Sequence, residues 1–222
     1  MGLGKKVIDF EPSEIEVQAQ EASMKFIMIL ILGWTILSSA AWAGVFNMPH
    51  FVSPDRSVLG IEPEAVLTSG GGVGMNLRYT HGLSESSNLT GIVGTGSGPR
   101  GFRLGAAMTF DVFPDAASQP GVGFGAQGLL VQLTQAAALE LTGFPYIHKR
   151  FPASEAQRVI AMEPFLALPI GLGLTQGSYR MITSLSIGSL FEHNEHFKSI
   201  VELTMGLSGS ETILSGGVSY YP

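Results

Sequence analysis

The sequence predicts an all-β protein, an antiparallel up-and-down transmembrane β-barrel of about ten strands. Beyond residue 44, apolar and polar residues alternate with a period of two, and no useful window shows the spacing of an amphipathic helix. Only 14% of the residues are charged, too few for the usual soluble surface. The face opposite the apolar one holds mostly Gly, Ala, Ser and Thr, which suits a narrow closed lumen.

The N-terminal residues are expected to lie outside the mature barrel. Residues 24–43 have a basic residue at Lys25, then an apolar run, then an A-x-A cleavage site that ends at Ala43, the features of a secretory signal peptide. The apolar run is shorter than the roughly 20 residues of a membrane-spanning helix, so a retained anchor is the less favoured alternative.

The stretches on either side of this leader complete the predicted organisation. Residues 1–23 are acidic and polar, unlike the start of an export leader, and are expected to be a mis-started or non-native extension. Residues 44–57 are expected to form an N-terminal periplasmic segment, and residues 58–222 the barrel domain.

Turn signals divide the barrel domain into ten predicted strands. Their ranges are 58–68, 72–81, 88–96, 101–112, 121–133, 137–147, 159–174, 178–190, 197–208 and 211–221. Most have the length that a tilted strand needs to cross a membrane. The longer predicted connections, 82–87, 113–120, 148–158 and 191–196, fall on the side of the two termini, the reverse of the usual asymmetry of such barrels.

Alternation is clearest in the second, fourth, seventh and ninth predicted strands. In the fourth strand, Leu104 and Phe110 stand on the apolar face while Arg103 and Asp111 stand on the other. In the seventh, the apolar face holds Ile160, Met162, Leu166, Leu168, Ile170, Leu172 and Leu174. A soluble sandwich also alternates, but its polar face is usually rich in Lys, Glu and Thr.

The sixth predicted strand is the least regular. The sequence "TGFPYIHKRFP" breaks the alternation and contains Pro145, which cannot donate a hydrogen bond to a neighbouring strand. If this strand and a neighbour do not cross, the count falls to eight, so an eight-stranded barrel stays as the alternative.

One glycine pattern has a second interpretation. Gly96, Gly98 and Gly101 have the spacing G-x-G-x-x-G, which binds a dinucleotide only when it follows a parallel strand and opens a helix. Here Pro99 follows and no helix is predicted, so a hairpin turn is favoured over a nucleotide site. No cofactor is predicted, and the net charge of −6 offers no broad basic surface for nucleic acid.

The leader, the repeated alternation and the terminal "GGVSYY" before Pro222 resemble small Gram-negative bacterial outer-membrane β-barrel proteins. The resemblance implies export to the cell outer membrane and contact with its lipid. It also implies recognition of the C-terminal strand by the assembly machinery, for which these proteins commonly end in an aromatic residue. The final Pro222 departs from that pattern and places Tyr221 second from last.

The charged side chains of the strands are predicted to share the lumen. Those that point away from the apolar faces are Glu62, Glu64, Arg78, Arg103, Asp111, Glu163, Arg180, Lys198 and Glu202. An isolated buried charge is costly, so a network of ion pairs that plugs the interior is favoured over a selective pore lining. The expected function is structural or envelope-integrity, or a narrow porin-like channel for small solutes.

Two further functions stay as alternatives. A barrel-edge lipid hydrolase could use His81, Ser84 and Glu85, although a pair of turn residues is the simpler interpretation. A soluble periplasmic barrel could bind an apolar ligand inside. His193 and His196 lie in a predicted turn and lack the helical spacing of a zinc protease, so no metal site is predicted.

Overall fold

The computed structural model describes residues 52–68, 70–97, 101–116, 118–132, 137–152, 159–175 and 177–222. The predicted extension, the predicted signal peptide and most of the predicted periplasmic segment lie outside these residues. Among the described residues, no helix is long and apolar enough to cross a membrane.

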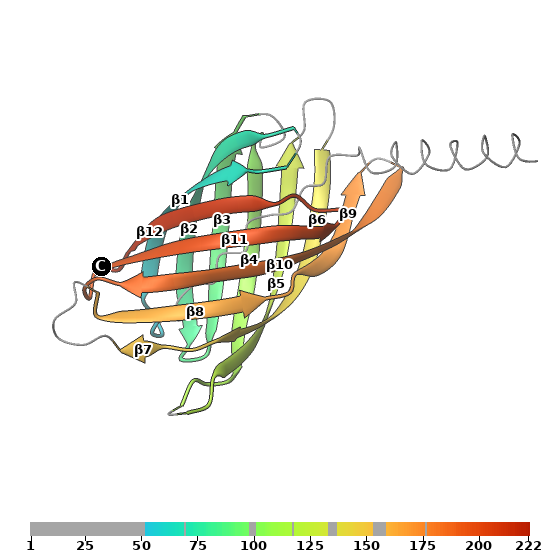
Figure 1. The fold of residues 1–222 in the computed structure, drawn as a ribbon. Coiled ribbons are helices and arrows are strands. Elements are labelled where there is room, and N and C mark those ends of the chain that lie inside the picture. The colour runs from blue at the N-terminus through green and yellow to red at the C-terminus, as the bar shows by residue number, and fades with distance from the viewer. Residues whose placement is uncertain are drawn as a thin grey trace, which may run out of the picture. The chain divides into compact units, whose positions relative to one another are not determined.

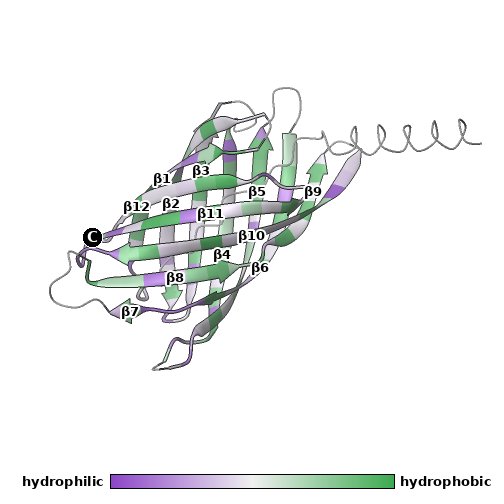
Figure 2. Cartoon of the chain, viewed as in Figure 1, coloured by the Kyte–Doolittle hydropathy of each residue, from purple (hydrophilic) through white to green (hydrophobic). Residues whose placement is uncertain are grey.

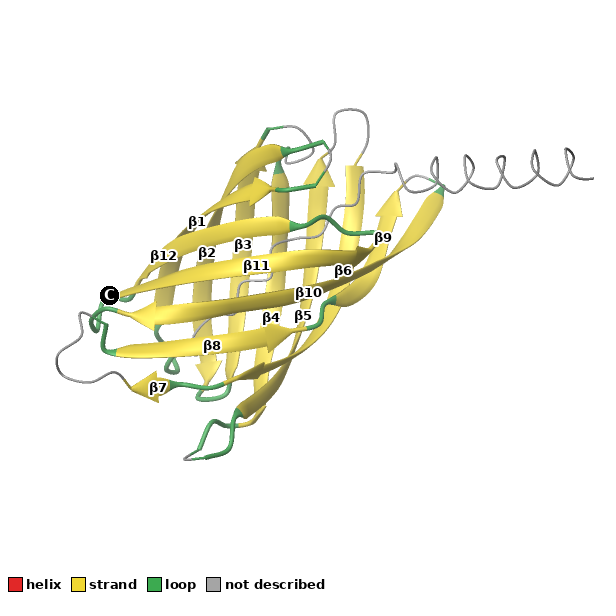
Figure 3. Ribbon diagram, in the orientation of Figure 1, coloured by secondary structure: helices red, strands yellow, loops and turns green. Residues whose placement is uncertain are grey.

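The described chain consists of antiparallel strands joined by loops, drawn in Figures 1 and 3. In chain order they are β1 (Ser57–Val66), β2 (Gly72–Ser84), β3 (Ser87–Gly96), β4 (Arg103–Phe113), β5 (Gly121–Gln132), β6 (Ala137–His148), β7 (Phe151–Pro152), β8 (Ala161–Ala167), β9 (Ile170–Thr175), β10 (Ser178–Glu192), β11 (Phe197–Ser208) and β12 (Ile213–Tyr220).

The sheet closes on itself. Strands β1 to β6 pair in chain order, each with its sequence neighbour, and β10 pairs with β11 and β11 with β12. The first and last strands pair, with Ile61 opposite Val218. β8 and β9 are two parts of one barrel strand, because both pair with β6 on one side and with β10 on the other. The ten-stranded prediction is therefore confirmed, and the eight-stranded alternative is wrong.

Proline breaks the seventh barrel strand but not the sixth. β6 runs through Pro145 without interruption, and Pro145 lies opposite Phe124 of β5. On its other side, the gap between β8 and β9 falls at Leu168 and Pro169. The carbonyl oxygen of Pro145 accepts a hydrogen bond from the amide of Leu168 at 3.0 Å. The sixth strand is therefore continuous, and the break lies in the neighbouring seventh strand, between β8 and β9.

The apolar face of every barrel strand points outward, and Figure 2 shows the hydrophobic residues along the strands. One outward side chain from each barrel strand is between 44% and 53% exposed: Ile61, Leu77, Val93, Leu104, Leu130, Leu141, Leu172, Ile187, Val201 and Leu214. Residues at the alternate positions point into the barrel, where most are buried.

The two ends of the barrel differ in their connections. We call the end at which β1 begins and β12 ends the terminal end. It carries the two longest stretches between barrel strands, 114–120 and 149–160, the second of which includes β7, whereas the connections at the opposite end have two to six residues. The predicted long connection at 82–87 is wrong: β2 and β3 extend into it and leave only residues 85–86 between them.

Candidate functional site

The candidate site is the interior of the barrel, which holds buried charges from one end to the other. Seven of the side chains predicted to lie in the lumen are at most 7% exposed: Glu62, Glu64, Arg78, Arg103, Glu163, Lys198 and Glu202. Asp111 and Arg180 are partly buried. The interior also holds Glu140, His148 and Glu211, which are buried but were not predicted as lumen charges.

Two arginines form ion pairs with glutamates of β1. Arg78 pairs with Glu62, and Arg103 pairs with Glu64. The other oxygen of Glu64 accepts a hydrogen bond from the side-chain amide of Asn76 at 3.1 Å. All five side chains are buried, so each charge has an opposite charge or a donor in place of water.

Glycines make room for the Arg103–Glu64 pair, which spans more strands than the Arg78–Glu62 pair. A methyl group at Gly94 would lie 3.0 Å from Nε of Arg103 and 2.3 Å from Oδ1 of Asn76. A methyl group at Gly74 would lie 2.6 Å from Oε1 of Glu64. The side chain of Arg103 therefore passes over the inner face of β3 and β2 where these two glycines leave space. We call Gly74 and Gly94 the glycine trough.

A third glutamate lies beside the Arg78–Glu62 pair. Oε1 of Glu202 accepts a hydrogen bond from the hydroxyl of Thr204 at 2.6 Å, and that hydroxyl lies 2.7 Å from the hydroxyl of Ser186. Oε2 of Glu202 is buried and has no hydrogen bond among the described residues. The middle of the lumen thus combines ion pairs with a small hydroxyl network.

His148 lies between two carboxylates near the terminal end. Its Nδ1 is 2.6 Å from Oε1 of Glu163, and its Nε2 is 3.4 Å from Oδ1 of Asp111. A histidine can donate from both nitrogens only as the imidazolium, and that form neutralises part of the charge of the carboxylate pair. Alternation along "FPYIH" places His148 on the inner face, so its position could have been found in the sequence.

A rim of ion pairs lies at the terminal end. Lys149 pairs with Asp115, Arg150 pairs with Glu192 at 2.6 Å, and Nζ of Lys198 lies 3.7 Å from Glu192. Partial burial favours the neutral form of Asp115, but hydrogen bonds from Lys149 and from the Arg150 amide outweigh it and lower the pKa of Asp115. At the opposite end, Arg180 pairs with Glu140 at 3.5 Å.

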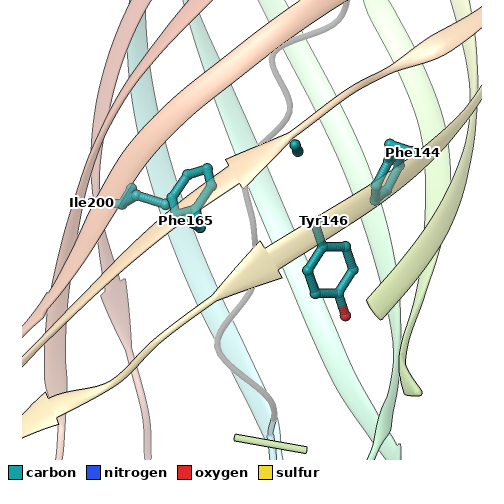
Figure 4. Close-up of a cluster of buried hydrophobic side chains, with 5 residues drawn as sticks. Phe144, Tyr146, Phe165 and Ile200 are labelled. Atoms are coloured by element: carbon teal, nitrogen blue, oxygen red, sulfur yellow. The ribbon is translucent and has the colours of Figure 1, made fainter. Parts of the chain in front are cut away.

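The lumen wall also has an aromatic layer that rests on glycines. Phe144, Tyr146 and His148 of β6 lie directly opposite glycines of β5, at positions 125, 123 and 121. A methyl group at Gly125 would lie 2.0 Å from the ring of Phe144. Figure 4 shows Phe144 and Tyr146 with Phe165 and Ile200, and together with Ala167 they form a buried cluster. We call these five residues the lumen apolar cluster.

The three residues considered for a lipid hydrolase, His81, Ser84 and Glu85, do not contact one another as a catalytic triad would. Nδ1 of His81 lies 3.0 Å from the hydroxyl of Ser57, and the hydroxyl of Ser84 lies 2.6 Å from that of Ser87. Glu85 is exposed in the turn between β2 and β3. Among the described residues, these contacts do not join His81, Ser84 and Glu85 into a relay from acid to histidine to serine.

The two loop histidines bond to separate groups. Nε2 of His193 lies 2.7 Å from the hydroxyl of Ser199, and Nδ1 of His196 lies 2.8 Å from the carbonyl oxygen of Tyr221. Among the described residues, no group of three or more His, Asp or Glu side chains is arranged to hold a metal ion.

No protein-family model and no curated protein matches the chain. Among solved structures, it is similar to a designed transmembrane β-barrel, with 12% identity and a TM-score of 0.38, over 78% of this chain and 100% of that one. It is also similar to an outer membrane channel from Pseudomonas putida F1, with 9% identity and a TM-score of 0.41, over 81% of this chain and 100% of that one.

Proposed function

We propose that the protein is an outer-membrane β-barrel with a closed interior, whose role in the cell envelope is structural rather than that of an open pore. One observation carries this proposal: the barrel is apolar outside on all ten barrel strands, and inside it Arg78 and Arg103 form buried ion pairs with Glu62 and Glu64. A soluble barrel of the same topology would need the opposite arrangement, with charges outside.

The exterior supports a bilayer as the surrounding medium. Exposed apolar side chains on every strand would form a large aggregation-prone surface in water. In the hydrocarbon of a bilayer, their exposure carries no free-energy penalty. Near the terminal end, six outward aromatic residues are 40–56% exposed: Tyr79, Phe110, Phe113, Phe124, Phe197 and Tyr220. Aromatic girdles of this kind lie at the membrane–water interface of outer-membrane barrels.

The interior supports a closed barrel. Buried inward side chains occur at every level, from Asn88 near the terminal end through Thr90 to Val131 near the opposite end, none more than 2% exposed. The cations of the lumen lie in ion pairs with carboxylates rather than in rings around an open passage. Barrels of this size have little interior space beyond what their side chains fill.

Two measurements test the proposal. The protein should fractionate with outer membranes and migrate differently on gels before and after heating, as folded barrels do. In planar bilayers the purified wild-type protein should give no steady single-channel conductance. Steady conductance would instead favour the narrow small-solute channel, and recovery in the soluble periplasmic fraction would overturn the membrane assignment.

A further inference from the structure

His148 joins three strands at the terminal end of the lumen. It is the last residue of β6, and its two ring nitrogens face Glu163 of β8 and Asp111 of β4. The three side chains are at most 9% exposed. The ring of Tyr146, from the lumen apolar cluster, lies 5.9 Å from the imidazole. Water therefore screens these contacts only weakly, and the charge of the imidazole decides whether the two carboxylates are attracted to it.

A glycine of β5 lets the imidazole reach across to β4. Gly121 lies directly opposite His148, and a methyl group at Gly121 would lie 2.2 Å from Nε2 of His148. Because that position has no side chain, the ring passes over β5 and faces Asp111 on the strand beyond. The contact between β6 and β4 is therefore built into the inner wall of the barrel.

The next two residues of the chain extend this junction to the loops. Lys149 pairs with Asp115, which lies in the connection after β4. The backbone amide of Arg150 donates to Asp115 at 2.6 Å, and its guanidinium pairs with Glu192 of β10 at 2.6 Å. Residues 148–150 thus bind β4, β8, β10 and the connection between β4 and β5.

The charged groups around the imidazole balance only when it is protonated. The carboxylates are Asp111, Asp115, Glu163 and Glu192, and the permanent cations are Lys149, Arg150 and Lys198 of β11. The phenols of Tyr146 and Tyr221 also face the carboxylates and are neutral at pH 7. Three permanent cations against these four carboxylates leave a charge of 3 − 4 = −1, which the imidazolium cancels.

His148 lies on the water side of the aromatic girdle. Phe113 of the girdle pairs with Val122, and His148 pairs with the next residue of β5 toward the terminal end. Burial favours the neutral ring, but the hydrogen bonds and charges of Glu163 and Asp111 outweigh it and raise the pKa of His148 above its ordinary 6.5. The stabilisation is therefore complete below about pH 6.5 and is lost as the pH rises through the higher folded value.

We propose that His148 is a pH-sensitive latch: its imidazolium holds the terminal ends of β4, β6 and β8 together, and loss of its proton loosens the junction and admits water to the lumen there. A neutral imidazole donates from one nitrogen only, so its other nitrogen turns a lone pair toward the second carboxylate. The latch rests on the closed interior proposed above and adds a dependence of that closure on pH.

A buried thiol reports whether the junction loosens. The protein has no cysteine, and Ala161 is 2% exposed on β8, two residues from Glu163 toward the terminal end, so Ala161→Cys introduces one buried thiol. Glu85→Cys, in the exposed β2–β3 turn, corrects for the faster reaction of thiols at higher pH. Relative to Glu85→Cys, Ala161→Cys should react with a maleimide about tenfold faster at about pH 9 than at about pH 6, the change that one pKa unit allows.

Two histidine variants decide whether the latch causes this change. His148→Gln keeps a neutral polar side chain but cannot gain the proton, so in the Ala161→Cys background it should remove the pH dependence. His193→Gln, which alters a loop histidine that contacts Ser199, should retain it. A relative rate that does not change with pH, or a change that persists in His148→Gln, would overturn the latch.

Urea unfolding replaces the labelling if Ala161→Cys does not fold. Between about pH 6 and pH 9 the unfolding midpoint of the wild-type protein should fall, and that of His148→Gln should fall less, because lysine and tyrosine ordinarily titrate above this range. Equal falls in the two proteins would overturn the latch.

Planar-bilayer conductance separates the latch from the function on which it rests. Steady wild-type conductance at about pH 6, where the imidazolium is present, would overturn the closed interior. A barrel that does not conduct at that pH, with labelling that is independent of pH, would overturn the latch alone.

Discussion

The guanidinium of Arg103 on β4 forms an ion pair with the carboxylate of Glu64 on β1, three strands further round the barrel. Residues 94 and 74, on the strands between them, are glycines, and the side chain of Arg103 fills the space that their missing side chains leave. The pair therefore ties together four consecutive strands, including the first, through contacts inside the lumen rather than through the backbone ladder.

Arg103→Ala should destabilise the folded barrel by about 3–5 kcal/mol, because it leaves the carboxylate of Glu64 buried without its partner. Urea unfolding of the refolded protein measures the change. Arg150→Ala is the matched control, since its pair with Glu192 is exposed on the arginine side and should contribute at most about 1 kcal/mol. Equal unfolding midpoints for wild type and Arg103→Ala would show that the lumen charges are solvated, as in an open pore.

The glycine trough can be tested by adding one methyl group. Gly94→Ala places that group 2.3 Å from Oδ1 of Asn76, so the Asn76–Glu64–Arg103 cluster must shift, and we expect a loss of stability of about 1–3 kcal/mol. Gly91→Ala, on the same strand but facing outward, should lose less than about 0.5 kcal/mol. A larger loss at Gly91 than at Gly94 in urea unfolding would contradict this account of the trough.

Alternation of the sequence was enough to predict the strands and the sides on which their residues lie. It works because side chains of a strand point to opposite faces at every step, even across the break at Pro169, where Leu168 and Ile170 both stay outward. Arg103 was expected near Glu62 and Glu64 of the first strand, but which of them it pairs with depends on the stagger between strands, which no single strand encodes. His148 is harder to recognise because the inward positions before it, Phe144 and Tyr146, are aromatic, so the inner face of this strand does not look polar in the sequence.

Stability should fall in acid partly through the rim of the terminal end. Because Lys149 and the Arg150 amide lower the pKa of Asp115 below its ordinary 3.8, this contribution is present above about pH 3.8 and is lost as the pH falls through the lower folded value. In urea unfolding at a series of pH values, Asp115→Asn should therefore lose less stability than wild type in this range.

Lys149→Gln is the control for the same interaction. It removes the cation and should reduce the acid-dependent loss in the same direction as Asp115→Asn. An acid dependence identical in wild type and both variants would mean that the pair contributes nothing measurable, as many partly exposed pairs do.

The last prediction concerns the outer face of the seventh barrel strand. Ile170 is 41% exposed on β9, between Leu168 and Leu172 on the same apolar face. If this face meets hydrocarbon, Ile170→Arg should cost roughly 2–4 kcal/mol in the free energy of folding into phospholipid vesicles, whereas Ile170→Leu should cost little. Tyr179→Arg, at the end of the strand pair and 80% exposed, should cost only about 0–1 kcal/mol because arginine there can reach the interface. Equal insertion of Ile170→Arg and wild type would show that this face does not contact lipid, and the membrane assignment would lose its main support.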